Sequence, residues 1–183
     1  MSEMNVQQII HNVLRNDENP PSADYSIYDY AAEVARDLDK GLLPALVTES
    51  IRQLPSATAM SLLENVLDYV SVPSLKDVLL DVLPQCRDVT SAGNVVGLLA
   101  ERCKMRRFEL AMRLIAGIQQ AADPCAQSNY AYALFSTLGH GSRWGAGLAA
   151  DDIENIRHAL AEVPTANLTK YARETLEECI AKG

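Results

Sequence analysis

Hydrophobic residues recur along most of the chain at the three- and four-residue spacing of an amphipathic α-helix. The clearest case is residues 92–119, where two apolar stripes flank a short polar turn: Val95, Leu98, Leu99 and Cys103, then Ala111, Leu114, Ile115 and Ile118. Residues three, four and seven positions apart lie on one face of a helix. This segment is therefore predicted to be a hairpin of two helices.

Stripes of the same kind predict about ten helices in all, and no segment alternates with period two for long enough to form a strand. The other predicted helices cover 3–15, Ser26 to Gly41, 43–54, 56–70, 74–83, 126–138 and two segments from about 153 to 163 and 166 to 180. The predicted fold class is all-α.

Residues with special backbone preferences mark several predicted helix ends. Ser26 with Asp29 three residues later has the spacing of a variant capping box, and Ser74 with Asp77 repeats it. Gly41 is predicted to end the second helix in a left-handed conformation.

The helices recur at a nearly regular interval. First helices of successive hairpins are predicted near residues 28, 58, 92, 126 and 166. Two-helix units repeating every 30 to 40 residues are typical of a short α-solenoid, in which each unit buries its apolar face on its neighbours. The alternative is a non-repeating helical bundle, which short loops would also produce.

One repeat unit has a recognisable pattern. Arg107-Phe108-Glu109-Leu110-Ala111, followed by Ile115 and Pro124, resembles the second half of a tetratricopeptide repeat. That family has an alanine at the position of Ala111, and Leu98 falls on its first-helix leucine. Leu99 stands where the family has a small glycine, Arg102 where it has a tyrosine, and Pro124 comes one residue late. The resemblance covers residues 92–124 and implies stacked hairpins of the tetratricopeptide-like or HEAT-like class.

Length and composition predict one folded domain over residues 1–183. Of the 183 residues, 48% are hydrophobic, which is typical of globular proteins. The Pro-Pro segment Asn16 to Ser22 reads as a linker, so an N-terminal helix with its linker (1–22) would precede a helical-repeat body (23–183).

The charge narrows the classes of partner. A net charge of −8 argues against nucleic acid and anionic membranes, because both are recognised through Lys and Arg. The charge is uneven: residues 1–50 carry nine acidic and three basic side chains, and 101–150 carry three and six. Residues 102–107 hold the densest basic run, interpreted as a charged helix turn.

Targeting and metal signals are missing from the sequence. No apolar run reaches the roughly 20 residues that cross a bilayer, and the amino terminus does not resemble a secretory signal. The four cysteines have no metal-binding spacing and read as free thiols. We therefore expect a cytoplasmic protein with no cofactor and no metal.

Three groups of residues are candidate partner-binding sites. The Gly139–Gly147 segment contains His140, Arg143 and Trp144, and Trp and Arg are common at binding hot spots. Tyr25, Tyr28 and Tyr30 form an aromatic group at a helix start, with at least one ring expected to point outward. The carboxylate pairs Glu64/Asp68 and Asp77/Asp81 occupy consecutive helices and could line one acidic face.

These observations favour a non-enzymatic module that binds another protein or a peptide, as a scaffold or adaptor does. One alternative is an immunity-protein or antitoxin type of inhibitor whose acidic face blocks a basic toxin or enzyme. A third is an enzyme that uses the Gly139–Gly147 loop. That loop lacks the phosphate-loop, dinucleotide and nucleophile-elbow patterns, so no residue is assigned a catalytic role.

Overall fold

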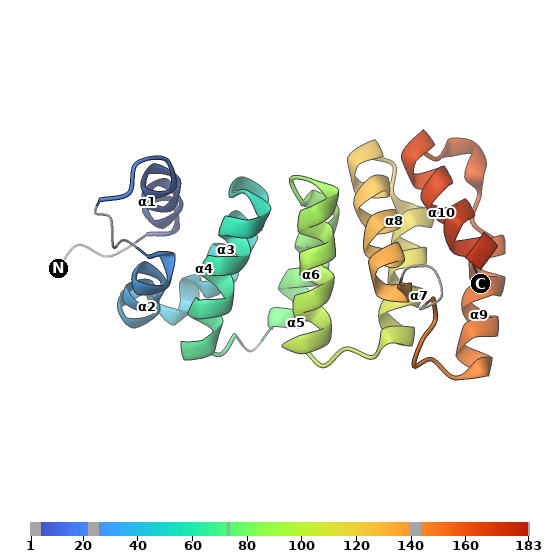
Figure 1. The fold of residues 1–183 in the computed structure, drawn as a ribbon, viewed down its shortest axis with the longest axis horizontal. Coiled ribbons are helices and arrows are strands. Elements are labelled where there is room, and N and C mark those ends of the chain that lie inside the picture. The colour runs from blue at the N-terminus through green and yellow to red at the C-terminus, as the bar shows by residue number, and fades with distance from the viewer. Residues whose placement is uncertain (1–4, 22–25, 73, 140–143, 183) are drawn as a thin grey trace. The chain divides into compact units, whose positions relative to one another are not determined.

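The computed structural model describes residues 5–21, 26–72, 74–139 and 144–182, and Figure 1 shows its fold. Every regular element among these residues is an α-helix or a short 3-10 helix, so the all-α prediction is confirmed. The chain divides into two compact units, Met1–Val82 (unit 1) and Leu83–Gly183 (unit 2).

Unit 1 is held together by aliphatic side chains. Its elements are α1 (Val6–Glu18), α2 (Ile27–Asp37), η1 (Lys40–Leu42), α3 (Leu43–Gln53), α4 (Ser56–Tyr69) and α5 (Leu75–Val82). Helix α2 packs against α4, while α3 packs against α1, α4 and α5. One side of each helix supplies Val, Ile or Leu to a shared core that includes Ile9, Ile10, Leu43, Leu46 and Leu62, each at most 2% exposed.

Two sequence-based expectations for unit 1 need correction. The first helix continues through Asn16 to Glu18, into the segment read as a linker, and Asn16 is buried. Gly41 does not end the second helix. That helix ends at Asp37 with Leu38 in an extended conformation, and Gly41 lies inside η1, where its N–H donates to the Asp39 carboxylate at 2.9 Å. Asp39 therefore caps the start of η1, and Leu38 takes the C-cap position of α2 that was assigned to the glycine.

Unit 2 is built in two layers of helices. Its elements are η2 (Leu83–Gln85), α6 (Val89–Glu101), α7 (Arg107–Gln120), α8 (Pro124–Leu138), α9 (Ala150–Ala161), η4 (Thr165–Asn167) and α10 (Lys170–Lys182). Helices α6, α8 and α10 lie side by side, and α7 packs against both α8 and α9 (Figure 1). Helix α8 is central because it contacts α6, α7 and α10.

Two buried amides of α8 tie unit 2 together. The Asn129 side chain donates to the carbonyl of Cys86 at 2.9 Å and to that of Pro84 at 3.4 Å. Gln127 donates to the carbonyls of Ala121 and Asn167 and accepts from the Thr169 N–H at 3.0 Å. These bonds satisfy backbone groups in connections that regular secondary structure leaves unpaired, which is what buried polar groups require.

Side-chain caps set the ends of the helices in unit 2. Asp88 accepts from the Ser91 N–H at 2.7 Å, so α6 begins at Val89, three residues earlier than the apolar stripe alone predicts. Asp123 caps α8 in the same way through the Ala126 N–H at 2.8 Å. At the end of α6, Lys104 has a φ of 53°, and Met105, which follows it, is buried. A left-handed residue followed by a buried apolar one is a common helix C-terminal arrangement.

Several helices pack against the helix two positions away along the chain. This holds for α1 with α3, α2 with α4 and α3 with α5, and again for α6 with α8, α7 with α9 and α8 with α10. Consecutive helices also pack together, most extensively α7 with α8, whereas α6 and α7, the helices of the hairpin predicted over 92–119, make few contacts with each other. Stacked hairpins produce contacts of both kinds. A continuous solenoid and the tetratricopeptide-like resemblance stay predictions.

Candidate functional site

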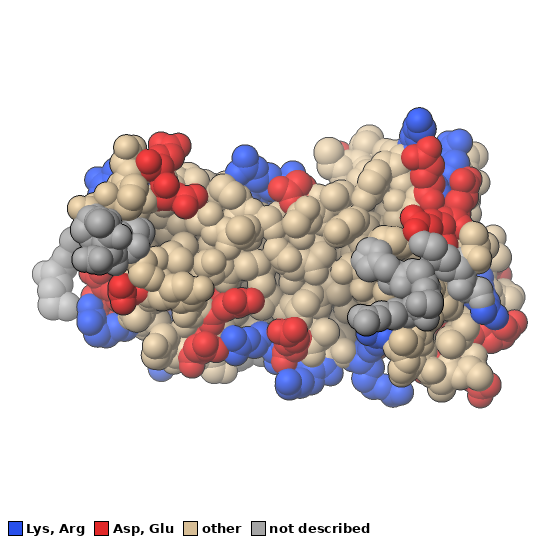
Figure 2. All heavy atoms as spheres, in the orientation of Figure 1, with Lys and Arg blue, Asp and Glu red and all other residues tan. Residues whose placement is uncertain are grey.

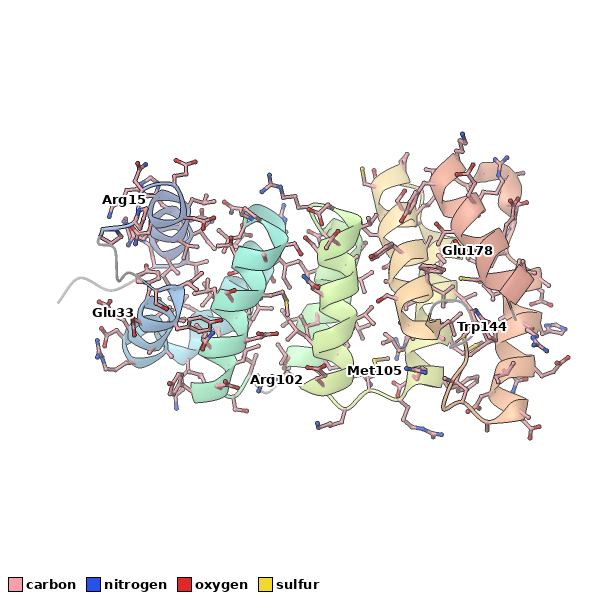
Figure 3. All side chains as sticks on the ribbon, in the orientation of Figure 1. Arg15, Glu33, Arg102, Met105, Trp144 and Glu178 are labelled. Atoms are coloured by element: carbon pink, nitrogen blue, oxygen red, sulfur yellow. The ribbon has the colours of Figure 1, made fainter. Side chains whose placement is uncertain are left out.

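Three residues of the predicted Gly139–Gly147 binding loop were candidate partner-binding residues. Of these three, Trp144 is described, whereas His140 and Arg143 lie outside the described residues. The Trp144 ring is half-buried, and the Arg157 guanidinium from α9 lies 5.9 Å from the ring centroid (Figure 3). A cation at this distance over an indole face is attracted to it. The indole N–H is buried and has no hydrogen-bond partner among the described residues. Much of Trp144 is thus used in packing against its own chain.

The part of the loop after Trp144 is fixed at several points. The Gly145 N–H donates to the carbonyl of Leu138 at 2.8 Å, and the Arg107 guanidinium of α7 donates to the carbonyl of Ala146. Gly145 and Gly147 have positive φ angles of 67° and 81°, which side chains disfavour. These contacts join the loop to the end of α8 and to the first turn of α7.

The two described tyrosines of the predicted group, Tyr28 and Tyr30, differ in their exposure to solvent. Tyr28 is 59% exposed at the start of α2, which agrees with the expectation that at least one ring points outward. Tyr30 instead packs against the core of unit 1, and its hydroxyl accepts from the Asn12 side chain at 3.3 Å. Tyr25 lies outside the described residues. Of this group, Tyr28 is the side chain that the described structure offers to a partner.

All four predicted acidic residues are exposed. Glu64 and Asp68 lie one turn apart on α4, and Asp77 and Asp81 lie one turn apart on α5. Both helices pack against α3. That the two pairs form a single face stays a prediction.

The sequence reasoning missed how completely the charge separates between the units. Residues 1–82 contain thirteen Asp or Glu and five Lys or Arg, for a net of −8, whereas residues 83–183 contain eleven of each, for a net of zero. Unit 1 thus carries the whole net charge of the protein. Charge counts over residues 1–50 and 101–150 do not show this division, because the boundary between the units lies at residues 82 and 83.

The acidic residues of unit 1 face solvent. Ten of its eleven described Asp and Glu residues are exposed. The same unit contains five Lys and Arg residues in all. Glu33, which the sequence reasoning did not select, lies four residues after Asp29 on α2, the helix that packs against α4 (Figure 3). Figure 2 shows carboxylates at several places on the visible face of unit 1. We call the exposed carboxylates of this unit the acidic surface.

A small pocket lies between α6, α7 and α8 of unit 2. Its volume is about 210 Å³. Val96, Met105 and Leu110 give it apolar walls, and Arg107 is the charged residue among those that line it. Helix α8 contains no Lys, Arg, Asp or Glu, and the one charged residue of α6 is Glu101 at its end, so the surface around the middles of these helices is mostly uncharged (Figure 2).

The described residues offer no group suited to metal chemistry. No three His, Cys, Asp or Glu side chains among them gather closely enough to hold a metal ion. The four cysteines are free thiols, and burial raises the pKa of the Cys86 thiol to about 12, with the Asp88 carboxylate adding to the effect. A thiol with so high a pKa is a poor nucleophile near neutral pH.

Two further findings concern membrane-spanning helices and the similarity of the chain to known proteins. Across the segments that the structure describes, no helix has both the length and the apolar character needed to cross a bilayer. Comparison of the chain with protein-family models, with curated proteins and with solved structures finds no match.

Proposed function

We propose that this chain is a non-enzymatic protein-binding module whose acidic surface captures a basic protein partner. The observation that carries the proposal is the confinement of the net charge of −8 to unit 1, where ten described carboxylates are exposed. Five Lys and Arg cannot neutralise eleven described carboxylates in that unit one for one. An acid excess of this size costs stability through self-repulsion, and a cationic partner would relieve it.

The acidic surface suits fast, charge-steered association. Complementary potentials raise the rate of diffusional encounter and fix the orientation of the partner more than they raise affinity. Exposed aromatic area beside the charge supplies short-range contact, and Tyr28, next to Asp29 on α2, provides it. A scaffold or adaptor that holds a basic segment of another protein would use the surface in this way.

An inhibitor of a basic toxin or enzyme is the second candidate, and the same charge separation favours it. An immunity-type protein would cover a cationic active site with its carboxylates. The two functions differ in their effect on the partner, since an inhibitor abolishes the partner's activity at equimolar ratio and an adaptor leaves that activity intact.

The test uses two variants that change the net charge equally. The first neutralises unit 1 through Glu64→Gln, Asp68→Asn, Asp77→Asn and Asp81→Asn. The second neutralises exposed or half-exposed acids of α9 and its C-terminus in unit 2, through Asp151→Asn, Asp152→Asn, Glu154→Gln and Glu162→Gln. Each variant is immobilised and used to capture proteins from a lysate of the source cells between 50 mM and 1 M salt.

We expect one partner to be captured near stoichiometrically at low salt by the natural chain and by the unit 2 variant. Capture by the unit 1 variant should fall at least tenfold, because four interfacial charges are lost. Raising the salt to 1 M should release the partner, since the screening length shrinks to about 3 Å. Equal loss in both variants, or capture that survives 1 M salt, would show that the acidic surface does not bind the partner.

A further inference from the structure

We propose that the pocket between α6, α7 and α8 binds the C-terminal residue of a protein partner. The apolar side chain of that residue would enter the pocket, and its α-carboxylate would pair with the Arg107 guanidinium. This site lies in unit 2 and prefers an anion, so it is independent of the acidic surface proposed for unit 1.

The size and lining of the pocket match one apolar side chain. Its volume of about 210 Å³ is below the roughly 300–1,000 Å³ of pockets that hold drug-sized ligands or cofactors. Val96, Met105 and Leu110 are buried or nearly so at its walls, and each is apolar. Met105, in the connection that follows α6, lies between the α6 and α8 ribbons in Figure 3. Removing a partner's aliphatic side chain from water at this place is favourable.

Gly97 leaves space in the pocket that the chain itself does not use. A β-carbon placed on Gly97 would meet no atom of the described residues within 4 Å beyond its own stretch of helix, although Gly97 lines the pocket in the middle of α6. The other glycine of this helix differs, because a β-carbon on Gly93 would lie 2.9 Å from the Tyr132 ring. Glycine inside a helix is less favourable than alanine, because it loses more conformational freedom on folding. Close packing against Tyr132 explains why residue 93 is a glycine. Space for a ligand would explain why residue 97 is a glycine.

Arg107 gives the pocket its charge preference. It is exposed, it lines the pocket, and its Nη1 donates to the carbonyl of Ala146, which holds the side chain in place. A guanidinium has five N–H donors, so donors remain for a carboxylate. Arg102, Lys104 and Arg106 are exposed in the preceding connection and add positive potential near the same helix end. Among the described residues that line the pocket, none is acidic.

A chain terminus meets both requirements with one residue. Its side chain and its α-carboxylate branch from the same Cα, so an apolar group can fill the pocket while the anion stays at the rim. Capture of a terminal carboxylate beside a side-chain pocket is a recurring mode of peptide recognition. The hydroxyl of Ser136, which is exposed at the pocket, offers one further donor to the peptide.

The test uses eight-residue peptides with an N-terminal fluorophore, a Gly-Ser body and Ala, Val, Leu or Phe at the C-terminus, each made as the free acid and as the amide. Binding is followed by fluorescence anisotropy. We expect the Leu or Phe acid to bind at least tenfold more tightly than its amide and than the Ala acid. In the Arg107→Gln variant, the affinity for the acid peptide should exceed the affinity for the amide peptide by less than about twofold.

Blocking variants separate the pocket from the rest of the surface. Gly97→Leu and Ser136→Leu fill the pocket from α6 and from α8. Each substitution should weaken the binding of the free-acid peptide that ends in Leu by at least tenfold. Arg113→Gln, an exposed change elsewhere on α7, should bind as the natural chain does. Circular dichroism establishes that each variant is folded. Equal binding of acid and amide, unchanged binding by the folded blocking variants, or no binding of any peptide at 1 mM would each overturn the proposal.

Discussion

Units 1 and 2 are folded by the same kind of element but stabilised and charged in different ways. Both units have aliphatic cores, but unit 1 carries the net charge of −8 on its surface, whereas unit 2 is electrically neutral and ties its connections together through the amides of Gln127 and Asn129. Buried polar side chains occur in both units, among them Asn16 and Ser50 in unit 1 and Gln127, Asn129 and Thr137 in unit 2. The net charge of the surface therefore separates the two units more clearly than their cores do.

The difference indicates a division of labour. A surface with uncompensated charge can attract a partner at long range, and an aliphatic core tolerates this because it needs no specific polar geometry. Buried amides that are fully bonded instead fix the connections of a fold in one arrangement. Such connections suit unit 2, where a small pocket depends on the placement of three helices.

The largest expected contrast concerns the thiols, all four of which lie in unit 2. Cys125 is exposed, whereas Cys86 is buried and its pKa is raised to about 12. We expect iodoacetamide at pH 8 to modify Cys125 at least about 100-fold faster than Cys86, because alkylation requires an accessible thiolate. Mass spectrometry of the labelled peptides gives both rates.

The same labelling in 8 M urea is the control, since the rates of all four thiols should then become similar. Rapid labelling of Cys86 in the native protein would mean that unit 2 opens readily and that its polar contacts do not hold it closed.

Truncation of the aliphatic core should be the most costly single change in unit 1. Leu46 is fully buried in α3, and Leu46→Ala should lower the free energy of unfolding by about 3 kcal/mol through lost burial and a residual cavity. Urea unfolding followed by circular dichroism measures the change. Tyr69→Ala, at a residue that is 70% exposed, should shift stability by less than about 0.5 kcal/mol.

Removal of a buried amide should have its main effect in unit 2. Asn129→Ala leaves the carbonyls of Cys86 and Pro84 without their side-chain donor and should cost about 2 kcal/mol. Urea unfolding of the variant tests this value, with Asn155→Ala on the exposed side of α9 as the matched change. If the two variants were equally stable, the hydrogen bonds of Asn129 would not contribute to the stability of unit 2.

The smallest effect should be a gain in unit 1. Ser50 is fully buried in α3, and within the described part of the chain its hydroxyl has no hydrogen-bond partner. Ser50→Ala removes that unpaired group and favours the helix, so the free energy of unfolding should rise by about 1 kcal/mol. A loss of stability in the same urea experiment would show that the hydroxyl is bonded in solution and that unit 1 is also stabilised by buried polarity.

The helices could be predicted because their information is local. Apolar stripes gave the element type throughout, and Ser26 marks a helix start that the structure confirms. Errors occurred where a side chain overrides a local preference. Asn16 favours a turn by itself, yet it is buried and the helix continues through it. Asp88 was a readable signal for the start of α6, because aspartate is a strong N-cap.

The candidate sites were predictable only in part, because they depend on contacts between distant residues. Exposure of Glu64, Asp68, Asp77 and Asp81 follows from their polarity and position on the helices. The pocket cannot be read from the sequence, since residues of three helices form it. The bonds of Gln127 join residues about 40 positions apart, and no local pattern separates this glutamine from a solvated one.

Trp144 makes the division between the units optically measurable. It is the sole tryptophan of the chain and belongs to unit 2, while four of the seven tyrosines belong to unit 1. Its emission should report on the environment around Arg157 and be blind to events in unit 1, whereas circular dichroism averages over the helices of both. Divergence of the two signals during denaturation would show that one half of the molecule can melt while the other stays folded.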